Sequence, residues 1–123
     1  MTTTSGDTND RLRRLASEEC KPCEGIDPLS SRDVEEALKD LPGWTFKNGS
    51  IEREFRFPTY KAGLDFAHAV GTIADEQDHH PDMVIGWRRV RVTWSTHSIK
   101  GLSGNDLIMA AKSELVYEKS SSR

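Results

Sequence analysis

The chain has 123 residues, of which 35% are hydrophobic and 30% charged, and its formal net charge is −3. This length suits one domain with a single core and is too short for two. The negative charge argues against nucleic acid as a partner, and no apolar run is long enough for a membrane span or a signal-peptide core. We therefore expect one cytoplasmic domain that binds neither nucleic acid nor membrane.

The N-terminal region is polar. Residues 1–19 contain few apolar side chains, and we expect them to form a flexible tail in front of the domain. The chain's two cysteines follow in the motif Cys20-Lys21-Pro22-Cys23. One pair cannot complete a four-ligand zinc site, and no strand–helix pattern around it indicates a thioredoxin-like redox motif. Reduced thiols are the simplest interpretation, with a labile disulfide or half of an intermolecular metal site as alternatives.

The first predicted elements are a helix and a hairpin. Ser30 is typical of an N-cap with Asp33 as its capping-box acid, and apolar residues follow at helical spacing until the Pro-Gly pair at 42–43. The Asn-Gly pair at 48–49 is a strong signal for a two-residue hairpin turn, and the residues on both sides alternate between apolar and polar. The sequence therefore predicts a helix followed by two antiparallel strands.

A second helix is predicted to begin at 58–59. Its apolar side chains recur at intervals of three and four residues: Tyr60, Leu64, Ala67, Val70, Ile73 and Ala74. Pro81 disfavours a helical conformation at the residue before it, so this helix should end before His80.

The second hairpin and the last helix complete the pattern. A short strand over 83–87 precedes an alternating strand that begins at Val90 and ends at His97. Ser103 then serves as an N-cap with Asp106 as its capping-box acid, and the helix should continue to about Tyr117. We expect residues 118–123 to be frayed.

This order of elements, α-β-β-α-β-β-α, predicts the fold class. Two hairpins separated by a helix are typical of an α+β fold, here a four-stranded antiparallel sheet with three helices packed on one face. We place this single domain at residues 20–117.

Three of the four histidines lie close together near acidic residues. The group consists of His79, His80 and His97, with Asp75 and Asp106 on either side. Imidazole gains or loses a proton near neutral pH, so the group predicts a proton-transfer site. Adjacent histidines at a helix end point in different directions, unlike the paired ligands that one helical face offers to zinc. Two simpler interpretations are surface histidines near a helix C-terminus and an aspartate that only caps a helix.

The same stretch resembles the signature of the pterin-4a-carbinolamine dehydratase family. The matching residues are Asp75, His79, His80, Pro81, Trp87, His97 and Asp106, supported by Leu-Pro-Gly-Trp at 41–44 and Ser-Thr-His at 95–97. The resemblance covers about residues 20–117. It departs at Asp75, where well-known members have glutamate.

The resemblance implies a reaction and a set of roles. The reaction is the dehydration of 4a-hydroxytetrahydrobiopterin to quinonoid dihydropterin and water, as a step of tetrahydrobiopterin recycling, with no metal and no cofactor. His79 and His97 would donate protons on the two faces of the pterin, and His80 would position the ring or act as a base. Asp106 would orient His97, and Asp75 would support His79. Substrate-binding residues would be Asp75, Pro81, Trp87, Ser95 and Thr96.

The resemblance further implies a homodimer or homotetramer. Two alternatives belong to other classes of function. One is a non-catalytic partner-binding module, because animal members of the family also stabilise dimers of a homeodomain transcription factor. The other is a metal-dependent hydrolase that uses the three histidines and Asp106 as ligands, for which two adjacent histidines give poor geometry.

Overall fold

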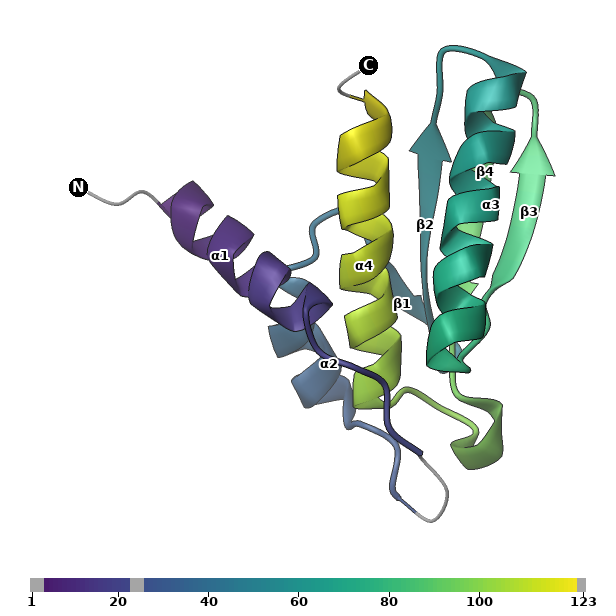
Figure 1. Cartoon of the computed structure of the whole chain (residues 1–123). Helices are drawn as coiled ribbons and strands as arrows, with labels where there is room; N and C mark the ends of the chain where they lie inside the picture. Colours follow the sequence, from purple (N-terminus) through teal and green to yellow (C-terminus); the bar gives the residue numbers. More distant parts are fainter. Residues whose placement is uncertain (1–3, 23–25, 122–123) are drawn as a thin grey trace.

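The computed structural model describes residues 4–22 and 26–121 (Figure 1). Its sheet contains β1 (Thr45–Lys47), β2 (Ser50–Arg56), β3 (Asp82–Gly86) and β4 (Arg89–Trp94), in the antiparallel order β1-β2-β4-β3. The central strands are aligned with Phe55 opposite Val90 and Ile51 opposite Trp94, and all four of these residues are buried. The predicted α+β fold with a four-stranded antiparallel sheet is confirmed.

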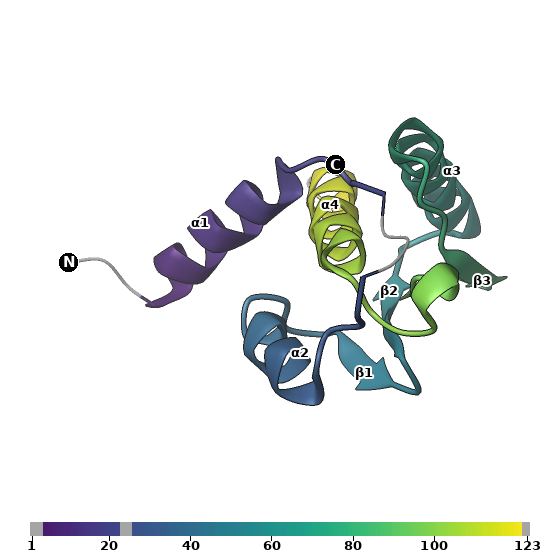
Figure 2. The same ribbon diagram turned by 90° about the horizontal axis from the view of Figure 1, so that it is seen from below.

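The described residues form four α-helices and one short 3-10 helix. These are α1 (Thr4–Ala16), α2 (Ser31–Leu38), α3 (Tyr60–Gln77), η1 (His97–Ile99) and α4 (Gly104–Ser121). Helices α3 and α4 cover one face of the sheet, and α2 lies near β1 (Figure 2). Buried Val34 joins α2 to the same core.

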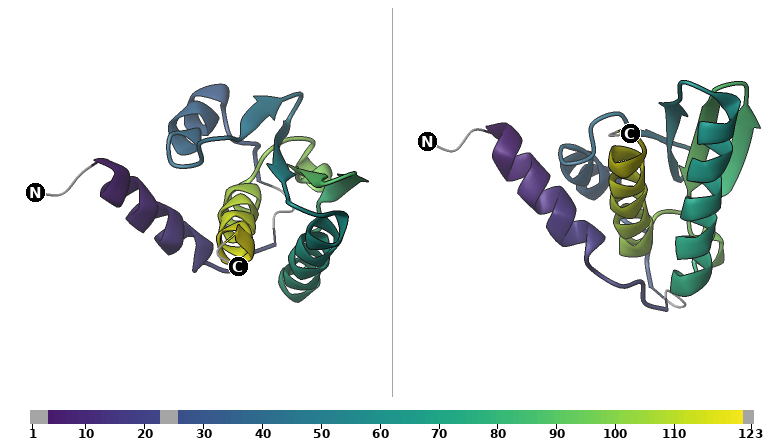
Figure 3. Two further views of the ribbon diagram at one scale, coloured as in Figure 1. Left: turned by 90° about the horizontal axis from the view of Figure 1, so that it is seen from above. Right: turned by 45° about the horizontal axis from the view of Figure 1, so that its top comes forward.

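The fourth helix, α1, corrects the expected number of three. It packs against the side of α4 that faces away from α3, as both views in Figure 3 show. Leu12, Leu15 and Ala16 contact the core at a spacing of three and four residues, and Ala16 is buried. These three apolar side chains were too few among polar neighbours to reveal the helix in the sequence. Helix α4 also runs to Ser121, beyond the predicted end near Tyr117, and Glu118 in this extension forms an exposed ion pair with Arg13 of α1.

The predicted local signals act as expected. The Ser30 side chain accepts a hydrogen bond from the Asp33 N–H, and Thr59 caps α3 in the same way through Ala62. Asn48 and Gly49 both have positive φ values, 51° and 78°, as a two-residue type I′ turn requires. No helix within 4–22 and 26–121 has the length and apolar character that a membrane crossing requires.

One polar side chain interrupts the apolar face of β2. Arg53 reaches α4 and donates to Glu114 Oε2, and Trp44 Nε1 donates to the same oxygen over 2.7 Å. The guanidinium carbon also lies 4.5 Å from the centroid of the Phe55 ring. This partly buried cluster ties the sheet to α4.

Candidate active site

The predicted site lies where the C-terminal end of α3 meets the N-terminal end of α4, at the lower end of the view in Figure 1. Asp78 ends α3 in the left-handed conformation, with φ 54° and ψ 43°, and its N–H bonds back to carbonyls of the last turn. The chain reverses there, so the two histidines that follow point toward different carboxylates. This agrees with the expectation that adjacent histidines at a helix end diverge.

His79 is bound to a buried carboxylate. Its Nε2 lies 2.6 Å from Asp106 Oδ1, and the side chains are 12% and 0% exposed. The second carboxylate oxygen accepts from Thr96 Oγ1 (2.7 Å) and from the Ser103 N–H (3.0 Å). The bond to Ser103 is the predicted capping-box contact. Asp106 is therefore both a helix cap and the partner of a histidine.

The His79 ring is also fixed by stacking. It lies nearly parallel to the indole of Trp94, with ring centroids 5.8 Å apart and an interplanar angle of 8°. Nε2–H is engaged by the carboxylate, and Nδ1 has no partner among the described residues. A ring held in this way can accept a proton at Nδ1 when neutral and donate one from Nδ1 when charged.

The predicted pairing of Asp106 with His97 is wrong. Strand β4 ends at Trp94, and the chain then turns through a bridge in which Thr96 N–H donates to Gly101 O over 2.9 Å. Thr96 therefore reaches Asp106, whereas His97 begins η1 with an exposed side chain.

Ser95 and Thr96, the two residues before His97, have different surroundings in the structure. The Thr96 backbone forms the bridge to Gly101 and its hydroxyl donates to Asp106, and Thr96 also lines the cleft that contains His79. Half-buried Ser95 lies with His97 and Lys100 along a hollow of about 320 Å³. Ser95 remains a candidate for substrate binding.

The predicted support of His79 by Asp75 is wrong as well. Asp75 Oδ1 lies 2.8 Å from Nε2 of His80, and both side chains are largely exposed. The reversal at Asp78 folds His80 back over the last turn of α3. Asp75, His80 and Pro81 line a hollow of about 350 Å³. His68 of α3 also lines it.

The structure does not bring Trp87 to the histidines. It lies at the tip of the hairpin between β3 and β4, at the end of β3 that is farther from His80, and it is 70% exposed. Its ring contacts the guanidinium of Arg88, whose central carbon is 4.9 Å from the ring centroid. The aromatic residue of the signature thus has no contact with this site in the described chain.

His79 lines a cleft at this end of the molecule. The cleft has a volume of about 480 Å³, within the usual range for small-molecule sites. Its lining includes Gln77, Ser98, Asn105 and residues 20–22. The sequence drew attention to Cys20 only for its thiol and placed none of these residues in the site. The signals for Asn105 and Gln77 were their positions directly before Asp106 and two residues before His79.

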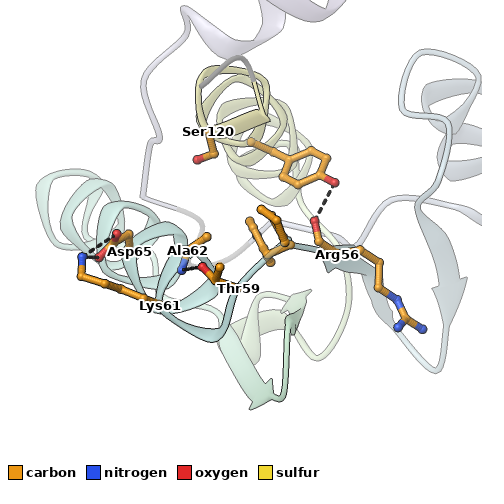
Figure 4. A pocket seen from close by; sticks show the side chains of 9 residues that line it. Arg56, Thr59, Lys61, Ala62, Asp65 and Ser120 are labelled. Carbon is orange, nitrogen blue, oxygen red and sulfur yellow. Dashed lines mark hydrogen bonds and ion pairs between the residues drawn. The ribbon is translucent and has the colours of Figure 1, made fainter.

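Another cavity, of about 250 Å³, lies at the opposite end of α3 (Figure 4). Its polar groups serve the fold: Tyr117 Oη donates to Arg56 O over 2.9 Å, and Lys61 forms an ion pair with Asp65. No histidine lines this cavity. Within the described ranges, no three His, Cys, Asp or Glu side chains are grouped so that they could hold a metal ion.

Comparisons with known proteins identify a family for this chain. The family model described as "Pterin 4 alpha carbinolamine dehydratase" matches residues 27–116. A protein of Nitrosospira multiformis is 40% identical over 105 residues, covering 85% of this chain and 93% of its own length. One of Rubrobacter xylanophilus is 42% identical over 103 residues, covering 82% and 96%. Both carry the name "Putative pterin-4-alpha-carbinolamine dehydratase".

A solved structure shows the same fold. The crystal structure of a "transcriptional coactivator/pterin dehydratase" from Brucella melitensis superimposes with a TM-score of 0.71 at 31% identity. The match covers 74% of this chain and 99% of that chain. The family model spans more than half of the chain and includes His79, His80, His97 and Asp106. The chain therefore belongs to the pterin-4a-carbinolamine dehydratase family.

Proposed function

We propose that this protein is an enzyme that removes water from a 4a-hydroxytetrahydropterin, with His79 as the principal acid–base group. The observation that carries this proposal is the buried His79–Asp106 hydrogen bond beside a cleft of about 480 Å³. A histidine fixed by a carboxylate and open to a small-molecule cleft is the arrangement that general acid–base catalysis requires.

The chemistry of the reaction fits these groups. Protonation of the 4a-hydroxyl lets the C4a–O bond break, and water leaves. Loss of the proton on N5 moves that electron pair into a new N5=C4a double bond, which gives the quinonoid dihydropterin. The charged His79 ring supplies the first proton from Nδ1, and the Asp106 carboxylate stabilises the imidazolium in its low-dielectric surroundings. The reaction neither consumes nor produces electrons, so its balance needs no redox cofactor.

We assign the other residues to supporting roles in this proposal. His97 donates a proton on the opposite face of the pterin, and His80, held by Asp75, positions the ring or takes the N5 proton. Pro81 and Ser95 contribute to substrate binding. The proposal includes a cytoplasmic location, and a homodimer or homotetramer as the family resemblance implies.

Stopped-flow dehydration of chemically generated 4a-hydroxytetrahydrobiopterin tests the function directly. We expect the purified protein to accelerate the reaction over buffer, equally with and without a chelator. A folded protein without any acceleration would contradict the proposal. It would favour a partner-binding module instead, a role consistent with the description of the Brucella protein as a transcriptional coactivator.

A further inference from the structure

The N-terminal segment 17–22, which we call the strap, passes across the joint between α3 and α4 (Figures 1 and 2). Residues 20–22 line the cleft that His79 faces. The strap precedes residue 27, where the family match begins. We propose that the strap forms one wall of the substrate site and that Gln77 and Asn105 are positioning residues that hold it there. This inference rests on the proposed function.

Two side chains hold the backbone of the strap. Asn105 is buried, and its amide makes two bonds with Lys21: Oδ1 accepts from the N–H over 2.9 Å, and Nδ2 donates to the carbonyl over 2.5 Å. Gln77 Oε1 accepts from the Cys20 N–H over 2.8 Å. Because the oxygen and the nitrogen of the Asn105 amide both bind Lys21, they fix the orientation of Lys21 as well as its distance from Asn105.

The upstream end of the strap is anchored independently. Ala16, the last residue of α1, is buried in the core, and its carbonyl accepts from Lys112 Nζ over 2.7 Å. A lysine at this position satisfies one of the unpaired carbonyls at the end of a helix. The fold therefore places the strap between two anchors, so the wall is present before a ligand arrives.

The two positioning residues are neighbours of the catalytic pair. Gln77 ends α3 two positions before His79, and Asn105 lies at the start of α4 directly before Asp106. The strap thus links the same two helix ends that the His79–Asp106 bond joins. Releasing it would widen the cleft beside His79 without removing any group that transfers a proton. A wall of this kind contributes to binding of substrate and transition state alike, so its loss raises KM more than it lowers kcat.

The experiment measures release of the strap separately from activity. In a Cys23→Ser background Cys20 is the single cysteine, and its half-buried thiol reports on the strap through its rate of reaction with a thiol reagent. We expect Gln77→Ala and Asn105→Ala to speed this labelling about tenfold, as the loss of one or two hydrogen bonds allows. Gln77→Glu keeps the acceptor and should label no faster than the parent, because its added negative charge disfavours the reactive Cys20 thiolate. Thr59→Ala, which removes a cap at the other end of α3, is the matched control and should also leave labelling unchanged.

Steady-state kinetics of dehydration then test whether the strap forms part of the substrate site. We expect the two alanine variants to raise KM about tenfold, with kcat within about twofold of the parent, the pattern of lost uniform binding. Saturating 7,8-dihydrobiopterin should slow Cys20 labelling in the parent. Faster labelling with unchanged KM would overturn the proposal, and so would unchanged labelling in both alanine variants. If the parent shows no dehydration, the proposed function fails, and the labelling of Cys20 in the presence of the pterin then tests the strap by itself. Protection of Cys20 would support the strap as a wall of a ligand site, and labelling at an unchanged rate would overturn it.

Discussion

Two carboxylates of α4, Asp106 and Glu114, each hold a basic side chain from another element. Asp106 accepts from His79 over 2.6 Å, and Glu114 accepts from the guanidinium of Arg53. The partners differ in chemistry, because arginine keeps its proton at any working pH whereas histidine exchanges one near neutrality. Of these two pairs, only the first can take part in proton transfer.

The surroundings of the two pairs also indicate that only the His79–Asp106 pair is open to a ligand. Arg53 lies over the rings of Phe55 and Tyr117, with 4.5 and 5.4 Å between its guanidinium carbon and the ring centroids. His79 has an aromatic ring on one side as well, but it opens onto the cleft. Burial of a charged pair is thus a poor guide to function in this molecule. The informative features are a partner that can titrate and an open path to a ligand.

The largest effect is expected from His79→Gln. The new side chain can still donate to Asp106, so the fold should persist, but it cannot exchange a proton. We expect dehydration to slow about 10²–10⁴-fold, the usual contribution of a positioned acid–base group. Arg53→Gln makes the matched change in the other pair and should leave the rate unaltered while lowering the urea midpoint. Full activity in His79→Gln would remove His79 from the mechanism.

The sequence predicted the framework better than the pairings. Periodicity located the sheet and three of the helices, and the residue types at Ser30 and at 48–49 defined a cap and a turn correctly. The sequence also singled out the histidines and aspartates of the candidate site, but it predicted both pairings wrongly: Asp106 binds His79, and Asp75 binds His80. The pairing depends on the left-handed conformation at Asp78 and on the bridge at Thr96. Single backbone angles of this kind follow from tertiary packing and leave little trace in residue spacing.

The two missed elements, α1 and the strap, left weak signals in the sequence for different reasons. Helix α1 presents three apolar side chains among many polar ones, and the strap contributes backbone groups to its contacts with Gln77 and Asn105. Backbone contacts depend on the path of the chain and place little demand on the type of residue. Sequence reasoning that searches for chemically active side chains therefore passes over them.

The next effect in size is expected from Asp106→Asn, which separates the two functions of this carboxylate. The loss of a charge-assisted hydrogen bond to His79 corresponds to about 1.5–3 kcal/mol, so dehydration should slow about 10–10²-fold. The weakened cap should lower the free energy of unfolding by about 0.5–2 kcal/mol. Stopped-flow rates and urea unfolding measure the two quantities independently. A loss of stability with an unchanged rate would mean that Asp106 acts only as a cap.

The Arg53–Glu114 pair should respond differently. Glu114→Gln keeps an acceptor for Trp44 but leaves the guanidinium without a counter-charge, at a cost of about 1–3 kcal/mol in the free energy of unfolding. Adding Arg53→Met removes that unpaired charge, and we expect the double variant to recover most of the stability. Dehydration rates should match the parent in both proteins. In the other pair, combining His79→Gln with Asp106→Asn should restore no activity.

The smallest effect is expected at the exposed pair, His80 and Asp75, whose side chains are 56% and 80% exposed. Solvent screens such pairs, and their contribution to stability is about 0–1 kcal/mol. Asp75→Ala should therefore change the free energy of unfolding by less than about 1 kcal/mol and the dehydration rate by less than about threefold, with the difference shrinking further at high salt. Asp75→Glu, which restores the residue of well-known family members, is the control and should behave like the parent. A tenfold loss of rate in the alanine variant that the glutamate variant does not show would make Asp75 and His80 a second working pair. The contrast between a buried catalytic carboxylate and an exposed auxiliary one would then no longer hold.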